Sequence, residues 1–111
     1  MTDFILRGWA FSPYVRAVRI ALEEKRADYR LVEMTPAELS DPAFRALSPF
    51  GKVPVLEHRG RAFIETPAIL RYVDAAAPGP SLQPEDPAQR AETEGLMLSA
   101  SAYFYPTGVM G

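Results

Sequence analysis

The spacing of apolar residues near the N-terminus predicts a strand, a helix and a second strand. Residues 4–6 form a short apolar run that is typical of a buried strand. Ser12 and Pro13 are the residue types of a helix cap and a first helical turn, and we expect this helix to end near Ala27. Its apolar face recurs at helical spacing and consists of Val15, Val18 and Leu22. A second strand over residues 29–34 completes a β-α-β order.

The middle of the chain predicts a short helix followed by a β-hairpin. Residues 35–49 combine a loop with a short helix, for which Asp41 is a suitable N-cap before a proline. Residues 53–56 are rich in β-branched side chains, and Arg59-Gly60 suits a tight turn into a further apolar run at 62–64. These two strands are therefore expected to pair with each other.

A last helix and a proline-rich segment close the predicted domain. Thr66-Pro67 repeats the combination of a capping residue and a proline, and the apolar face of the helix that follows consists of Ile69, Tyr72 and Val73. Prolines are concentrated in residues 78–86, which we interpret as a linker before a new helix. The order β-α-β-α-β-β-α over residues 1–77 predicts an α/β domain with a mixed sheet, which is the order of the thioredoxin-like fold.

Composition narrows the classes of function. With 48% hydrophobic and 23% charged residues, the 111-residue chain is expected to fold. A net charge of -2 without a basic run gives no reason to expect nucleic-acid binding. The chain has no cysteine, which excludes thiol catalysis and thiolate metal sites, and its single histidine makes a metal site unexpected. We see no leader peptide and no membrane span, so a cytoplasmic protein is expected.

Three stretches, in order and at matching spacing, resemble one known family. They are Phe11–Arg19 at the first predicted helix, Leu47–Leu56 before the hairpin, and Ile64–Tyr72 after it. The second is similar to an N-P-x-G-K-V-P-x-L pattern, with Ser48 in place of Asn. The third is similar to E-S-x-A-I-x-x-Y, with Thr66 in place of Ser. Together they resemble the N-terminal domain of cytosolic glutathione S-transferases of the serine type.

The resemblance covers about residues 3–77 and has implications for the whole protein. It implies a thioredoxin-like domain followed by an all-helical domain, of which residues 87–111 are the incomplete start. It also implies binding of reduced glutathione as a co-substrate, transfer to an electrophilic small molecule, and a homodimer. We therefore expect a truncated chain that is inactive in conjugation by itself, because this family builds its electrophile pocket largely from the helical domain.

Ser12 occupies the place of the catalytic hydroxyl in the serine-type members. A hydroxyl at a helix N-terminus is suited to donate a hydrogen bond to a thiolate, and the N–H groups there favour negative charge. The resemblance thus implies that Ser12 stabilises the glutathione thiolate. The alternative is a serine that only caps its helix. Tyr14 is a weaker candidate for the donor.

The remaining candidates belong to the second and third stretches. Pro54 is expected to be cis, which presents the Val53 backbone to the cysteinyl part of glutathione; the alternative is a proline at a strand start. Glu65 is assigned to the γ-glutamyl ammonium and Thr66 to its carboxylate, against the alternative of a capping threonine with a nearby acid. Lys52 is assigned to the glycyl carboxylate, with an exposed loop lysine as the alternative.

Other residues receive structural interpretations. We expect His58 to be a partly exposed strand residue without a role. Trp9 and Phe11 lie near the proposed site, but core packing is the favoured interpretation. We expect the stretch Tyr103–Tyr105 to form a buried helix–helix contact, with a place in the electrophile pocket as the alternative. In a chain of this length the apolar side chains that would lack partners are Leu96, Met97, Leu98, Tyr103 and Phe104.

Two further functions stay open beside transfer. One is a glutathione-dependent isomerase or dehalogenase, which uses the same site with another substrate. The other is a module that has lost catalysis and binds a partner. A thiol-disulfide oxidoreductase is excluded, because the site has no cysteine.

Overall fold

The structure is a computed structural model that describes residues 3–99. The chain divides into two compact units at the junction of Gly79 and Pro80. In chain order the elements are β1 (Phe4–Gly8), α1 (Pro13–Glu24), β2 (Tyr29–Glu33), the 3-10 helix η1 (Pro36–Ser40), α2 (Pro42–Leu47), β3 (Val55–His58), β4 (Arg61–Ile64), α3 (Thr66–Ala76) and α4 (Pro87–Ser99).

The four strands of the first unit form one mixed sheet in the order β2-β1-β3-β4. β1 and β2 are parallel, and the other two pairings are antiparallel. The parallel pair needs a crossover connection, which α1 provides. The turn between β3 and β4 places both Arg59 and Gly60 at positive φ, as expected for a tight hairpin. The predicted thioredoxin-like order is confirmed.

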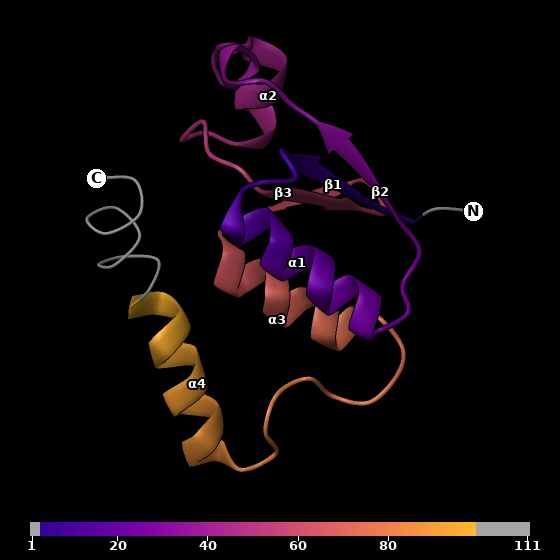
Figure 1. The fold of residues 1–111 in the computed structure, drawn as a ribbon, viewed down its shortest axis with the longest axis vertical. Helices are drawn as coiled ribbons and strands as arrows, with labels where there is room; N and C mark the ends of the chain where they lie inside the picture. Colours follow the sequence, from indigo (N-terminus) through magenta and orange to yellow (C-terminus); the bar gives the residue numbers. More distant parts are fainter. Residues whose placement is uncertain (1–2, 100–111) are drawn as a thin grey trace. The chain divides into compact units, whose positions relative to one another are not determined.

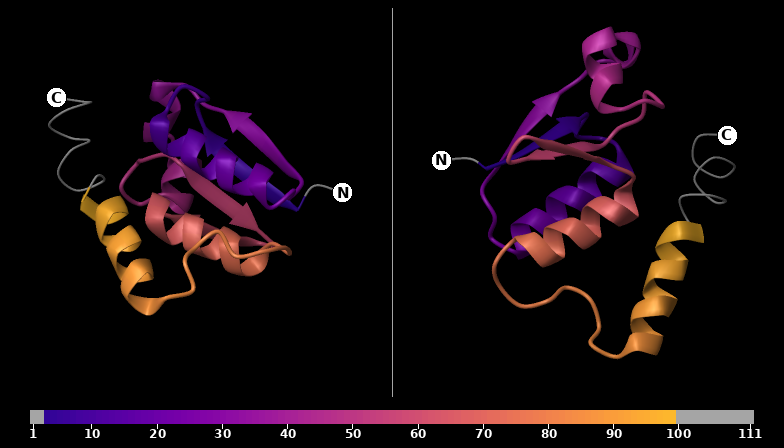
Figure 2. Two further views of the ribbon diagram at one scale, coloured as in Figure 1. Left: turned by 60° about the horizontal axis from the view of Figure 1, so that its bottom comes forward. Right: turned by 180° about the vertical axis from the view of Figure 1, so that it is seen from behind.

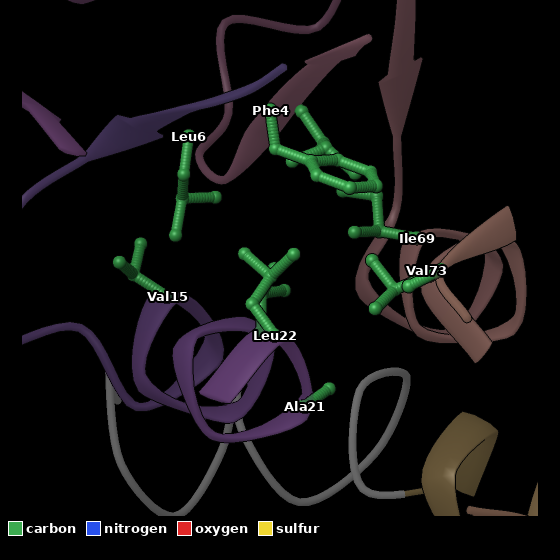
Figure 3. Packing of buried hydrophobic residues seen from close by; sticks show 10 residues of the cluster. Phe4, Leu6, Val15, Ala21, Leu22, Ile69 and Val73 are labelled. Atoms are coloured by element: carbon green, nitrogen blue, oxygen red, sulfur yellow. The ribbon is translucent and has the colours of Figure 1, made fainter. Parts of the chain in front are cut away.

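The main core lies between the sheet and two helices that cover one of its faces. α1 and α3 lie side by side on that face in all views (Figures 1 and 2). Figure 3 shows Phe4 and Leu6 of β1 directed toward side chains of both helices. Burying one such aliphatic or aromatic side chain contributes about 1.5–3 kcal/mol, so this layer dominates the stability of the unit. The buried residues of this core are Phe4, Leu6, Val15, Val18, Ala21, Leu22, Leu56, Ile69, Val73 and Ala77.

A second, smaller apolar cluster joins the end of β2, the start of β3 and helix α2. It consists of Met34, Phe44 and Val55, with half-buried neighbours that include Val53 and Ile64. Asp41 caps α2 through a hydrogen bond from the Ala43 N–H at 3.0 Å, as the sequence predicts. Through this cluster, α2 packs against the segment that leads into β3.

Helix α1 ends at Glu24, three residues before the predicted end near Ala27. Arg26 adopts a left-handed φ of 54°, and the Ala27 N–H donates back to the Leu22 carbonyl at 2.9 Å. Glycine usually occupies such a position at a helix end, and none is present. The sequence therefore lacked the usual signal for this terminus.

Just past α1, a buried ion pair ties the two core helices together. The Lys25 Nζ lies 3.0 Å from the Asp74 Oδ1 of α3, with the side chains 1% and 10% exposed. The same ammonium group donates to the Gly79 carbonyl at 3.3 Å. Lys25 therefore binds both Asp74, in the C-terminal half of α3, and the Gly79 carbonyl in the segment that follows α3.

The second unit is described over one helix, α4. It begins at Pro87, as predicted, and Asp86 accepts a hydrogen bond from the Gln89 N–H at 3.0 Å. Leu96 and Leu98 are exposed in the structure. The predicted contact at residues 103–105 lies outside the described residues. No helix between residues 3 and 99 is long and apolar enough to cross a membrane.

Candidate functional site

One edge of the sheet gathers most of the residues that the sequence singles out. Arg7 of β1 lies opposite Val55 of β3, and Val55 lies opposite Ile64 of β4. The antiparallel pairings mean that β1 ends, β3 begins and β4 ends at this edge. The turn after β1, the loop before β3 and the residues after β4 therefore meet here. These segments contain Ser12, Val53, Pro54, Glu65 and Thr66.

Ser12 caps α1 and keeps its hydroxyl hydrogen available. The Val15 N–H donates to the Ser12 Oγ at 3.4 Å, which uses only a lone pair of that oxygen. The side chain is buried, with 4% of the residue exposed. Capping and donation to a ligand are thus compatible, because the N–H group and the O–H group use different sides of the oxygen. Tyr14, in the first turn of α1, is half-buried.

The loop before β3 is fixed by a buried serine. The Ser48 Oγ accepts from the Lys52 N–H at 3.1 Å and donates to the Lys52 carbonyl at 2.9 Å. This serine replaces the usual Asn of the pattern and bonds both backbone groups of one residue. The peptide bond between Val53 and Pro54 is cis, as the resemblance predicts. The Lys52 side chain is exposed.

Val53 lies outside β3 and keeps free backbone groups. It takes part in none of the backbone hydrogen bonds that the turns, caps and loops of residues 3–99 form. Such a residue is suited to pair with an added strand.

Gly8 marks where three segments of the site approach each other closely. A Cβ at this position would lie 2.5 Å from the Val15 Cγ2 and 3.4 Å from the Val53 Cβ. The Gly8 carbonyl also accepts from the Met34 N–H at 3.2 Å. Only a residue without a side chain lets the end of β1, the first turn of α1 and the Val53 loop come this near.

At the start of α3 the structure corrects one detail of the sequence interpretation. Glu65, and not Thr66, occupies the N-cap position, and Thr66 is the first helical residue. Only one residue separates β4 from α3, so Glu65 makes the whole change of direction, with φ 73° and ψ 117°. The Glu65 side chain is exposed and makes no capping hydrogen bond, while Thr66 is buried. A strained non-glycine residue of this kind is often found at a functional site.

Both core helices therefore begin at the same edge. The first turn of a helix carries N–H groups without intrahelical partners, and the helix dipole adds positive potential there. In α3 these N–H groups are those of Thr66 and Ala68, because Pro67 has none and the Ile69 N–H bonds to the Glu65 carbonyl at 2.9 Å. The edge is suited to a ligand with a carboxylate and an anionic sulfur, and exposed Glu65 suits an ammonium group.

Two expectations about neighbouring residues are wrong. His58 is buried, with 4% exposed, because it lies on the core face of β3 and stacks on Phe4 with ring centroids 3.9 Å apart. Phe11 is 92% exposed and does not pack in the core. It lies in the tight turn that the Ser12 N–H closes onto the Trp9 carbonyl at 3.1 Å, which keeps its side chain out of the core. Trp9 is half-buried.

Two buried polar contacts were not predicted from the sequence. The Tyr72 hydroxyl lies 2.6 Å from the His58 Nδ1, and Lys25 is paired with Asp74 inside the unit. Helical periodicity placed Tyr72 on the apolar face of its helix but gave no signal for its polar partner. Within residues 3–99, no group of three or more His, Cys, Asp or Glu side chains is placed to hold a metal ion.

Comparison with known proteins identifies the fold and the family. The family model described as "Glutathione S-transferase, N-terminal domain" matches residues 6–81. A probable glutathione S-transferase from Nicotiana tabacum is 35% identical over 91 residues, which are 82% of this chain and 41% of the relative. A maleylacetoacetate isomerase from Pseudomonas aeruginosa is 35% identical over 94 residues, which are 80% of this chain and 44% of the relative.

A solved structure agrees with these sequence matches. A glutathione transferase homologue from Sulfitobacter, with bound glutathione, superposes with a TM-score of 0.87 at 31% identity and covers 96% of this chain and 52% of its own. The chain thus spans about half the length of the relatives it matches. Because the family model covers most of the chain, the protein belongs to the glutathione S-transferase family and carries that family's N-terminal domain.

Proposed function

We propose that the edge formed by the starts of α1, β3 and α3 binds reduced glutathione. The observation that carries this proposal is the convergence of two helix N-termini and the Val53 loop at one edge of the sheet. Glutathione has two carboxylates, an ammonium, a peptide backbone and a thiol. The edge offers a group of matching chemistry for each of them. The relative from Sulfitobacter was solved with bound glutathione, which supports the same ligand here.

Each group has a proposed partner. Glu65 pairs with the γ-glutamyl ammonium, and Thr66 donates its hydroxyl and N–H groups to the adjacent carboxylate. The Val53 N–H and carbonyl pair with the cysteinyl backbone like an added strand. Lys52 extends from its fixed backbone to the glycyl carboxylate.

Ser12 is the proposed catalytic residue. Its hydroxyl donates to the sulfur of glutathione and stabilises the thiolate over the thiol. The thiol proton passes to water, and the thiolate attacks an electrophilic carbon. A sulfur–carbon bond forms, and in a substitution the leaving group departs with its electron pair. The protein itself forms no covalent bond with glutathione or with the electrophile during these steps.

For the whole protein we propose a cytoplasmic glutathione transferase that acts as a homodimer. In this proposal, residues 1–77 form the glutathione-binding domain, residues 78–86 the linker, and residues 87–111 the start of a helical domain that completes the electrophile site. The 111-residue chain then binds glutathione but does not turn over an electrophile. Turnover of a model aryl halide by this chain would contradict the proposal that the helical domain is required for transfer.

A second candidate is a glutathione-dependent isomerase. The 35% identity to a maleylacetoacetate isomerase from Pseudomonas aeruginosa favours it over a dehalogenase. The isomerase and transferase reactions differ in one observable quantity. An isomerase regenerates glutathione, whereas a transferase consumes one molecule for each conjugate that it releases.

Calorimetric titration of the chain with reduced glutathione tests the binding proposal. We expect saturable binding that Glu65→Ala weakens strongly and Ser12→Ala changes little, because Glu65 holds the peptide and Ser12 acts on the thiol. Glu24→Ala, which removes an exposed carboxylate at the far end of α1, is the matched control and leaves the affinity unchanged. Absence of binding by the folded chain would make a partner-binding module the leading function.

A further inference from the structure

His58 is buried at the sheet edge that lies opposite the candidate site. It pairs with Phe4 in β1 and with Arg61 in β4, three residues away from the row that borders the site. Its Nδ1 lies 2.6 Å from the Tyr72 hydroxyl oxygen, and its Nε2 lies 3.2 Å from the Asp3 Oδ2. A carboxylate only accepts, so in the neutral imidazole Nε2 carries the hydrogen, and Nδ1 accepts from the Tyr72 hydroxyl.

Tyr72 of α3 contacts both strands of the hairpin. Its hydroxyl bonds to His58 of β3. Its ring stacks on Phe63 of β4, with centroids 4.0 Å apart and planes 24° from parallel. One side chain of the helix is thereby fixed by a directional hydrogen bond and by a stacked ring.

This contact differs in kind from the apolar packing of the same helix, and it links α3 to the hairpin, whereas the Lys25–Asp74 ion pair links α3 to the end of α1. Ile69 and Val73 are fully buried, but apolar contacts have little directional preference and permit small rotations and shifts along the helix axis. A hydrogen bond loses strength steeply when its angle or length changes. Thr66 lies six residues before Tyr72, which is about 9 Å along an α-helix. Because a short helix moves as a stiff rod, a contact at Tyr72 also restrains the position of the first turn.

We propose that the His58–Tyr72 hydrogen bond is a positioning device for the glutathione site. It fixes the rotation of α3 about its axis and its position along that axis, so that Glu65 and the free N–H groups of the first turn meet the γ-glutamyl end of glutathione. His58 and Tyr72 do not touch the ligand. The inference rests on the proposed function, because it concerns the affinity for glutathione.

The test compares two variants that both remove this hydrogen bond, of which His58→Phe also removes the Nε2 contact to Asp3. Tyr72→Phe deletes a single oxygen atom and keeps the ring stacked on Phe63. His58→Phe keeps a ring against Phe4 and removes both nitrogens. Val18→Ala is the stability control, because it weakens the core on α1 without touching this contact. The dissociation constant for glutathione and the unfolding midpoint are measured for each variant and for the double variant.

We expect each single variant to raise the dissociation constant about three- to tenfold, which is the scale of one lost hydrogen bond. The double variant binds no worse than the weaker single one, because both changes remove the same bond. In spectra of the free chain, the backbone amides of Thr66 and Ala68 shift in Tyr72→Phe and stay in place in Val18→Ala.

Three outcomes decide the inference. Unchanged affinity in Tyr72→Phe, together with unchanged amide shifts at the start of α3, overturns it while the proposed function stands. Equal loss of affinity in Val18→Ala at a matched loss of stability also overturns it, because the effect then follows stability alone. Absence of binding by the unmodified chain overturns both the inference and the proposed function.

Discussion

The buried ion pair at the end of α1 allows a sharp prediction about stability. Lys25→Met keeps most of the length and apolar surface of the side chain and removes the ammonium group. The Asp74 carboxylate then loses a cation at 3.0 Å in a place where it is only 10% exposed, and the Gly79 carbonyl loses its donor at 3.3 Å. The packing of the stem is retained, so the effect isolates the charge.

Removing one partner of a buried ion pair costs about 3–5 kcal/mol. We expect about 3 kcal/mol here, at the lower end, because the carboxylate keeps some contact with water. A small domain has about 5–15 kcal/mol of stability in total, so this loss is large. The assay is urea unfolding followed by circular dichroism, with linear extrapolation to water.

Two further variants complete the experiment. Lys25→Met combined with Asp74→Leu is expected to recover most of the loss, because apolar replacement of both partners of a buried pair is often neutral. Arg30→Met, at an exposed position on β2, is the control and stays within about 0.5 kcal/mol of the parent chain. A loss below about 1 kcal/mol in Lys25→Met would refute the reasoning, because the pair would then behave like an exposed surface bridge.

Three more predictions concern the backbone, two of them at the site and one in the hairpin turn at the opposite edge of the sheet. Glu65→Gly removes the strain of a non-glycine residue at positive φ and raises the free energy of unfolding by about 1 kcal/mol, although it weakens glutathione binding. Lower stability with unchanged binding would contradict this prediction. Gly8→Ala forces a Cβ against Val15 and Val53 and lowers the free energy of unfolding by about 1–3 kcal/mol, which denaturant unfolding measures. Arg59→Asn places a better residue for positive φ in the hairpin turn, so the chain should melt a few degrees higher and not lower.

The sequence was sufficient for elements whose signals are local. The cap and proline at Ser12 and Pro13 marked the start of α1, and Asp41 marked that of α2. The Arg59-Gly60 dipeptide located the hairpin turn. Each of these signals works within four residues, so no knowledge of the tertiary structure is needed to interpret it.

Features that depend on distant residues were not predictable in this way. The burial of His58 depends on Phe4 and Tyr72, which lie far from it in the sequence. The early end of α1 rests on an arginine in a conformation that glycine usually adopts. Glu65 occupies the N-cap position because α3 already begins at Thr66, one residue after β4 ends at Ile64, whereas the Thr66-Pro67 signal placed the cap one residue later.

The candidate site was assembled from a resemblance and from short motifs, and the register explains why these segments meet. Val53 and Thr66 lie in separate motifs, yet the pairing of Val55 with Ile64 places both at one edge. The sequence alone named the residues, while the structure supplies the reason that they lie together. The roles of these residues remain predictions.

The most direct test of the account is a pH titration of glutathione bound to this chain, followed through the ultraviolet absorbance of the thiolate. A free cysteine thiol has a pKa of about 8.5. The account predicts that bound glutathione ionises at a clearly lower pH than free glutathione, and that Ser12→Ala shifts this ionisation back upward while glutathione stays bound. Ionisation of the bound thiol at the same pH as in free glutathione, or no response to Ser12→Ala, would contradict the proposed role of Ser12.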